Sequence, residues 1–131
     1  MKFILVLFFF FSSFLTLAQD KIWFDANGNV STKENAVYYR VSSKNKTKKQ
    51  LIIDYYISGK KAKESYFVKG KQDGKYVEFY NTGEVRVTGV YQNGLKTGMW
   101  KTYDKKGKIK KKGKYFKGEK VGVWKTFYKN N

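Results

Sequence analysis

The sequence has no cysteine, no histidine and no proline. Without cysteine the chain cannot form disulfide bonds, so its stability must come from packing and strand pairing. The lack of histidine and cysteine also removes the usual zinc ligands, the commonest general base and the thiol nucleophile. The lack of proline leaves every backbone N–H available to a β-ladder. We therefore predict a protein that is not an enzyme, with no catalytic, metal-binding or cofactor-binding residues and no cofactor.

Arginine is also scarce, although the chain is strongly basic. Lysine and arginine number 28 against 10 acidic residues, a formal net charge of +18, yet Arg40 and Arg86 are the only arginines. Lysine is a strongly hydrated point charge, whereas the planar guanidinium of arginine recognises phosphates and base edges through paired bonds. The lysine excess favours a solubilising surface, with salt-sensitive contact to a polyanion as the alternative. Specific binding to a nucleic acid is not expected.

Residues 1–18 have the pattern of a signal peptide. Lys2 precedes an apolar run that ends at the small residue Ala18, and cleavage there would leave Gln19 as the new N-terminus. A membrane anchor is the alternative, but Ser12 and Ser13 interrupt the run, which is shorter than the roughly 20 apolar residues that span a bilayer. We predict an exported protein, periplasmic or secreted after cleavage, with no transmembrane segment in the mature chain.

A repeat of 24 residues organises the chain from about Leu51 onward. Glycines recur at this spacing in several columns, and aromatic residues recur in the same frame, which is the signature of a repeat architecture. The positions that we assign to the repeat are Gly74, Tyr76, Gly83, Gly89, Tyr91, Gly94, Gly98, Trp100, Tyr103, Gly107, Gly113, Tyr115, Gly118, Gly122, Trp124 and Phe127.

Each repeat unit is predicted to be a strand, a glycine turn, a second strand and another glycine turn. Aromatic and β-branched runs bounded by glycine, asparagine and aspartate indicate strands and hairpins. In residues 84–91, apolar and polar residues alternate, which gives one apolar and one wet face. A glycine in mid-strand weakens a sheet, so Gly89 and Gly113 need a reason. Our hypothesis is that they leave space for a tryptophan or tyrosine ring from a neighbouring strand.

The repeat resembles a known family. Gly98, Trp100, Lys101 and Tyr103, with the glycine and tyrosine columns that follow, resemble the MORN repeat, and more closely its bacterial variant in proteins catalogued as YwqK-type antitoxin components. The resemblance covers about residues 51–131. It implies antiparallel hairpins side by side in an elongated, twisted sheet, with binding or scaffolding roles. The chain departs from the pattern at Gln50, which replaces an opening glycine, and at Asp104, which replaces an aromatic residue.

The segment before the repeats, residues 19–50, is predicted to be an N-terminal cap, because the end of a repeat array needs an atypical element over its edge. Residues 22–24 and 37–41 are strand-like and residues 25–28 indicate a turn. Ser31 and Glu34 have the spacing of a capping box and predict one helical turn. Residues 42–50 are polar and basic, which indicates a loop. The predicted fold is all-β: a cap followed by hairpin repeats in a single sheet.

The function that follows is a non-enzymatic binding module. Glu78 and Glu84 are the only suggestion of paired carboxylates, but threonines replace Glu78 in later repeats, so it is expected to pair with surface lysines. In a chain this small most aromatic rings must form the core. The leading hypothesis is an exported module for a protein or an anionic envelope polymer; the alternatives are a toxin-binding antitoxin and contact with a membrane surface. The candidate partner-binding residues are Tyr80, Arg86, Lys101, Lys125 and Tyr128.

Overall fold

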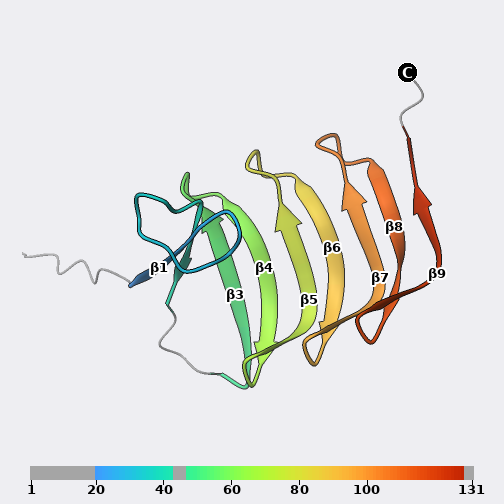
Figure 1. Ribbon diagram of the computed structural model, residues 1–131, viewed down its shortest axis with the longest axis horizontal. Coiled ribbons are helices and arrows are strands. Elements are labelled where there is room, and N and C mark those ends of the chain that lie inside the picture. Colours follow the sequence, from blue (N-terminus) through green and yellow to red (C-terminus); the bar gives the residue numbers. More distant parts are fainter. Residues whose placement is uncertain (1–19, 43–46, 129–131) are drawn as a thin grey trace, which may run out of the picture.

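The computed structural model describes residues 20–42 and 47–128. Within them the chain forms one open sheet of nine antiparallel strands, in which each strand pairs with the next along the chain (Figure 1). The strands are β1 (Lys21–Phe24), β2 (Tyr38–Val41), β3 (Lys49–Tyr56), β4 (Lys61–Val68), β5 (Lys71–Phe79), β6 (Val85–Gln92), β7 (Leu95–Tyr103), β8 (Ile109–Phe116) and β9 (Glu119–Thr126). The predicted all-β fold of consecutive hairpins is confirmed. The predicted signal peptide and Gln19 lie outside the described residues.

The hairpin turns at one end of the repeats contain two residues each, Lys69-Gly70, Asn93-Gly94 and Lys117-Gly118. The first residue of each turn has φ between 47° and 49°, and the glycine has φ between 78° and 84°. Two successive positive φ angles define a type I′ turn, whose twist matches the right-handed twist of the paired strands. Glycine at the second position therefore follows from the backbone that a tight hairpin requires.

The sheet is bent at regular intervals. The register shifts between Asp54 and Tyr55 on β3, and again one and two periods later on β5 and β7. A second series of shifts lies on β4, β6 and β8, and in it the shift on β8 follows that on β6 by one period. Each shift is a β-bulge or irregularity, which increases local twist and bends the strand. The curved strands of Figure 1 follow from these repeated defects.

Tyrosine hydroxyls connect neighbouring hairpins. The Tyr56 hydroxyl donates to the carbonyl oxygen of Phe79 at 2.7 Å, and one period later the Tyr80 hydroxyl donates to the carbonyl oxygen of Tyr103 at 2.7 Å. The next position in this series is Asp104, the departure noted in the sequence. Its carboxylate accepts the backbone N–H groups of residues 106 and 108 at 2.8 and 2.9 Å, so it closes its own turn instead.

The sheet is a single layer with a thin core. Among the described residues the buried apolar side chains are Ala62, Tyr76, Val77 and Trp100, and no side chain has less than 2% of its surface exposed. Residues 20–42 and 47–128 form no second sheet or helical layer over either face. Cross-strand side-chain pairs must therefore supply much of the stability that a two-layer fold obtains from an interior.

The N-terminal segment adds two short strands and a loop to the array. The Asp25 carboxylate accepts the N–H groups of Asn27 and Asn29 at 2.8 and 2.9 Å, which forms the turn predicted at residues 25–28. The predicted helical turn is absent from residues 31–36, where only isolated turn bonds such as Asn35 N to Thr32 O at 3.3 Å form. The loop predicted at 42–50 is too long, because β3 already begins at Lys49. Residues 43–46 of that loop lie outside the described residues. No helix in the described ranges is long and apolar enough to cross a membrane.

Candidate binding surface

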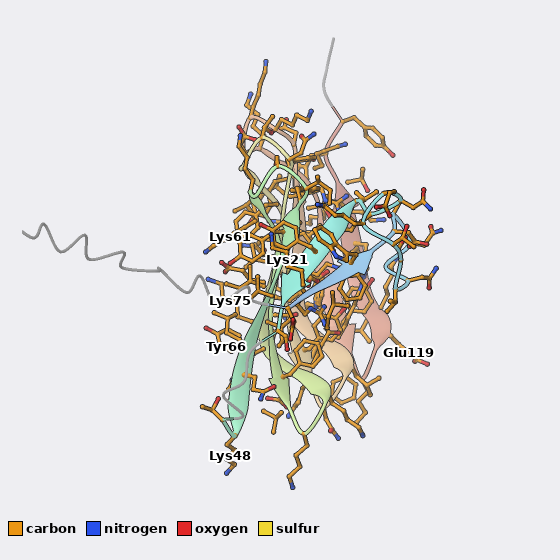
Figure 2. All side chains as sticks on the ribbon, turned by 90° about the vertical axis from the view of Figure 1, so that its left-hand side faces the viewer. Lys21, Lys48, Lys61, Tyr66, Lys75 and Glu119 are labelled. Atoms are coloured by element: carbon orange, nitrogen blue, oxygen red, sulfur yellow. The ribbon has the colours of Figure 1, made fainter. Side chains whose placement is uncertain are left out.

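The sheet has two chemically different faces. Strand pairing places Tyr76, Tyr91, Trp100, Tyr115 and Trp124 on one side, here called the aromatic face. It places Lys75, Lys101, Lys112, Lys114 and Lys125 on the other side, here called the lysine face. Figure 2 looks along the sheet from its β1 side, with Lys61, Tyr66 and Lys75 to one side and the loop that follows β1 to the other.

On the aromatic face the rings form a continuous row across five strands. Successive rings from Tyr76 to Trp124 have centroids 5.1–5.8 Å apart, mostly in edge-to-face orientation. Such pairs contribute about 0.5–1.5 kcal/mol each beyond the burial of their surface. The prediction that these rings form the core is confirmed for Tyr76 and Trp100, whose side chains are buried at 6% and 5% exposure. Tyr91, Tyr115 and Trp124 are half-buried.

The mid-strand glycines make this row possible. A Cβ atom on Gly89 would lie 2.2 Å from the ring of Trp100, and one on Gly113 would lie 2.2 Å from the ring of Trp124. The other ten glycines have positive φ angles, whereas these two do not. Gly89 and Gly113 are therefore required because they have no side chain, and not because of their backbone conformation. The hypothesis that a ring from a neighbouring strand occupies the space they leave is confirmed.

Lysines cover the rings at repeat-equivalent positions. The Lys96 ammonium lies 4.5 Å from the centroid of Trp100, and the Lys120 ammonium, one period later, lies 4.8 Å from that of Trp124. A cation above an aromatic ring is stabilised by the ring quadrupole, by about 0.5–1 kcal/mol at an exposed site. These lysines are partly engaged with the protein itself, and so, on the other face, is Lys112, whose ammonium lies 5.7 Å from the centroid of Phe127.

The lysine face carries three lysines directly opposite one another. Lys101 pairs with Lys112, and Lys112 pairs with Lys125, on three successive strands. No acidic side chain stands in this row, and β7, β8 and β9 together contain eight lysines and one carboxylate, Glu119. Like charges placed opposite each other on neighbouring strands are destabilising. The C-terminal three strands therefore concentrate positive charge at a cost to the fold.

The structure brings together two of the five candidate partner-binding residues. Lys101 and Lys125 lie in the same row of the lysine face. Arg86 lies outside this row and pairs with Glu78, Tyr80 is half-buried with its hydroxyl bonded to the main chain, and Tyr128 is 85% exposed beyond β9. Sequence reasoning missed Lys112, which links the two lysines. The strand register would have revealed it, because Lys112 falls between two repeat-equivalent positions on the intervening strand.

The expected environment of Glu78 was wrong. Its carboxylate accepts hydrogen bonds from the Tyr76 hydroxyl, at 2.5 Å, and from the Arg86 guanidinium, and not from surface lysines. Burial, and then the bond to Glu78, raise the pKa of the Tyr76 hydroxyl. Burial likewise raises the pKa of the Tyr91 hydroxyl. The carboxylate is thus committed to a small network on the aromatic face, which explains why its repeat equivalents need not be acidic.

Two hairpins of the sheet match a known family. Residues 72–93, which lie in β5 and β6, match the family model described as "MORN repeat variant", and so do residues 96–117, which lie in β7 and β8. These two hairpins are similar to MORN repeats. The two matches start 24 residues apart, which is the period of the glycine columns. The match identifies a repeat module of a kind that often serves in binding, and it does not extend to an antitoxin role. No curated protein and no solved structure proved similar to the chain.

Proposed function

We propose that this protein is an exported, non-enzymatic MORN-type module that binds an anionic polymer of the cell envelope through its C-terminal strands. The observation that supports it is the row of Lys101, Lys112 and Lys125 on the lysine face, within three strands that hold eight lysines and one carboxylate. A polyanion laid across this row would relieve the repulsion between neighbouring lysines. Because lysine ammonium groups are hydrated point charges, such binding depends on charge density and weakens with salt.

The test compares a charged with a neutral polymer of the same backbone. The purified protein is expected to bind dextran sulfate and not dextran, and to lose affinity steeply as salt rises. The triple variant Lys101→Glu, Lys112→Glu, Lys125→Glu should lose most of the affinity. A matched triple variant at Lys33, Lys48 and Lys60, which are exposed and lie far from β7–β9, changes the net charge equally and should lose much less.

Two outcomes would contradict the proposal. Equal losses in both triple variants would mean that total charge, and not the lysine row, attracts the polymer. A stoichiometric protein partner that stays bound at high salt would replace the polymer with a specific protein–protein contact.

Export is tested separately, by fractionating cells and sequencing the N-terminus of the recovered protein. Gln19 as the first residue in the envelope fraction supports the proposal. An uncleaved chain confined to the cytoplasm would instead favour the antitoxin alternative, because an antitoxin is expected to meet its toxin there.

A further inference from the structure

The two arginines of the chain lie in one pocket. A cavity of about 230 Å³ opens on the aromatic face at the N-terminal end of the sheet, and both Arg40 and Arg86 line it. The turn at residues 26–28 closes one side of this pocket, here called the arginine pocket. Its volume is below the roughly 300–1,000 Å³ of sites for drug-sized ligands, so it suits a ligand of monosaccharide size.

Charged side chains of alternating sign cross the floor of the arginine pocket. Strand pairing sets Arg40 opposite Asp54, Asp54 opposite Lys63, and Lys63 opposite Glu78. Arg86, on the next strand, completes the row by binding Glu78. Asp54 is 8% exposed and accepts two bonds from Arg40, at 2.6 and 3.0 Å. Arg40 and Asp54, and likewise Glu78 and Arg86, are therefore paired before any ligand arrives.

This row keeps unused hydrogen-bonding capacity. A guanidinium has five N–H donors, of which Arg40 gives two to Asp54 and Arg86 gives one to Glu78. In the part of the chain that the structure describes, the Lys63 ammonium has no hydrogen-bond or ion-pair partner. Both carboxylates retain lone pairs beyond the bonds they already accept. Three cations against two carboxylates leave one excess positive charge.

Aromatic rings line the same cavity. The guanidinium of Arg40 lies 5.0 Å from the centroid of Phe24, and the rings of Tyr38 and Tyr56 are 5.4 Å apart. Burial raises the pKa of the Tyr56 hydroxyl, so this group stays neutral at physiological pH. The pocket thus combines apolar ring surface, acceptors for hydroxyl groups, and one uncompensated cation with spare donors.

We propose that the arginine pocket binds one uronate unit, an acidic sugar, of an anionic polysaccharide. The sugar carboxylate meets Lys63 and the free N–H groups of the arginines, its hydroxyl groups donate to Asp54 and Glu78, and its C–H face lies against Tyr38 or Phe24. A simple carboxylate would use only the cations, and a neutral sugar would leave the excess charge unmet. The inference rests on the proposed function, of which it specifies the polymer.

The experiment is a titration of the purified protein with glucuronate, glucose, acetate and inorganic phosphate, followed by the backbone amide signals of Asn27 and Gly28 in two-dimensional NMR. Glucuronate is expected to shift these signals saturably, and the other three compounds much less. The Lys63→Gln variant should weaken glucuronate binding by about tenfold or more, because it removes a charge-assisted bond. Lys75→Gln, an exposed lysine on the opposite face (Figure 2), is the matched control and should leave binding unchanged.

Equal shifts with acetate or phosphate would overturn the proposal, because they would show a site for any anion. Equal shifts with glucose, no saturable shift at all, or an unaffected Lys63→Gln variant would overturn it as well. The triple variant of the lysine row separates this proposal from the preceding one. This variant should lose its affinity for dextran sulfate but still bind glucuronate. Failure of one proposal can therefore be told apart from failure of the other.

Discussion

Replacing Gly89 by alanine tests the close approach of a tryptophan ring to the backbone. The new Cβ atom would lie 2.2 Å from two atoms of the Trp100 ring, and ordinary contact begins at about 3.4 Å, so the ring must retreat by about 1 Å or more. Trp100 is 5% exposed and lies within 5.2–5.8 Å of three tyrosine rings, which confine it. The strain cannot be relieved without disturbing the aromatic row.

The expected loss of stability is about 3 kcal/mol. Overpacking a confined site costs about 1–3 kcal/mol, and a displaced tryptophan loses part of its contacts with the neighbouring rings in addition. In the background of Trp100→Leu, which removes the ring, the same change should be neutral or stabilising by about 0.5–1 kcal/mol, because alanine is better than glycine within a strand. The coupling between the two positions is therefore about 3–4 kcal/mol.

The assay is equilibrium unfolding in urea, followed by far-ultraviolet circular dichroism, for the four chains of this double-mutant cycle. Gly113→Ala provides a comparison, because the ring it meets belongs to Trp124, which is half-buried on the last strand and freer to move. Its cost should be smaller, about 1–2 kcal/mol. Equal destabilisation by Gly89→Ala with and without the Trp100 ring would refute the reasoning and make glycine a backbone requirement.

Three further predictions concern the lysine face and the tyrosines. Lys112→Glu should raise stability by about 0.5 kcal/mol, as it turns two like-charge cross-strand pairs into opposite-charge pairs; high salt should abolish this gain in urea unfolding. Tyr80→Phe should cost about 1 kcal/mol, since it removes the bond to the Tyr103 carbonyl, whereas Tyr128→Phe at an 85% exposed site should change nothing; equal effects would contradict this. The pKa of the Tyr76 hydroxyl is raised in the folded chain, so above about pH 10 the unfolded chain releases a proton that the folded chain keeps. The free energy of unfolding is therefore unaffected below about pH 10 and falls above it by about 1.4 kcal/mol per pH unit. Thermal melts between about pH 9 and 12 should therefore be less alkali-sensitive in Tyr76→Phe, and an unchanged slope would refute the assignment.

The repeat made most of the fold predictable from sequence. The glycine columns located the hairpin turns, and the mid-strand glycines Gly89 and Gly113 located the packed tryptophans. Both features could be found because the turn and the ring packing are each decided by residues close together in the repeat. Asp104 also departed from the pattern for a local reason, since it closes its own turn. Local sequence rules capture features that nearby residues decide.

The arginine pocket could not be predicted in this way. Arg40 lies before the repeats, where no period fixes the register. Arg86 lies four strands further along the chain, beyond three register shifts. Their meeting depends on how β2 aligns with β3 and on where the turn at residues 26–28 settles on the sheet. The bond of the Tyr80 hydroxyl could not be predicted for a similar reason, because its partner Tyr103 belongs to the next repeat.

The uneven distribution of charge along the sheet gives the molecule a polarity. Strands β1–β5 contain seven lysines and arginines and four carboxylates, whereas β7–β9 contain eight lysines and one. In the field of a negatively charged surface such a body rotates as it approaches, and its C-terminal edge arrives first. The residues that line the arginine pocket belong to β1–β6 and the turn at residues 26–28, so the pocket would stay clear of that contact. A protein oriented in this way would hold one polymer with its C-terminal strands and present the arginine pocket to a second polymer, and so link the two.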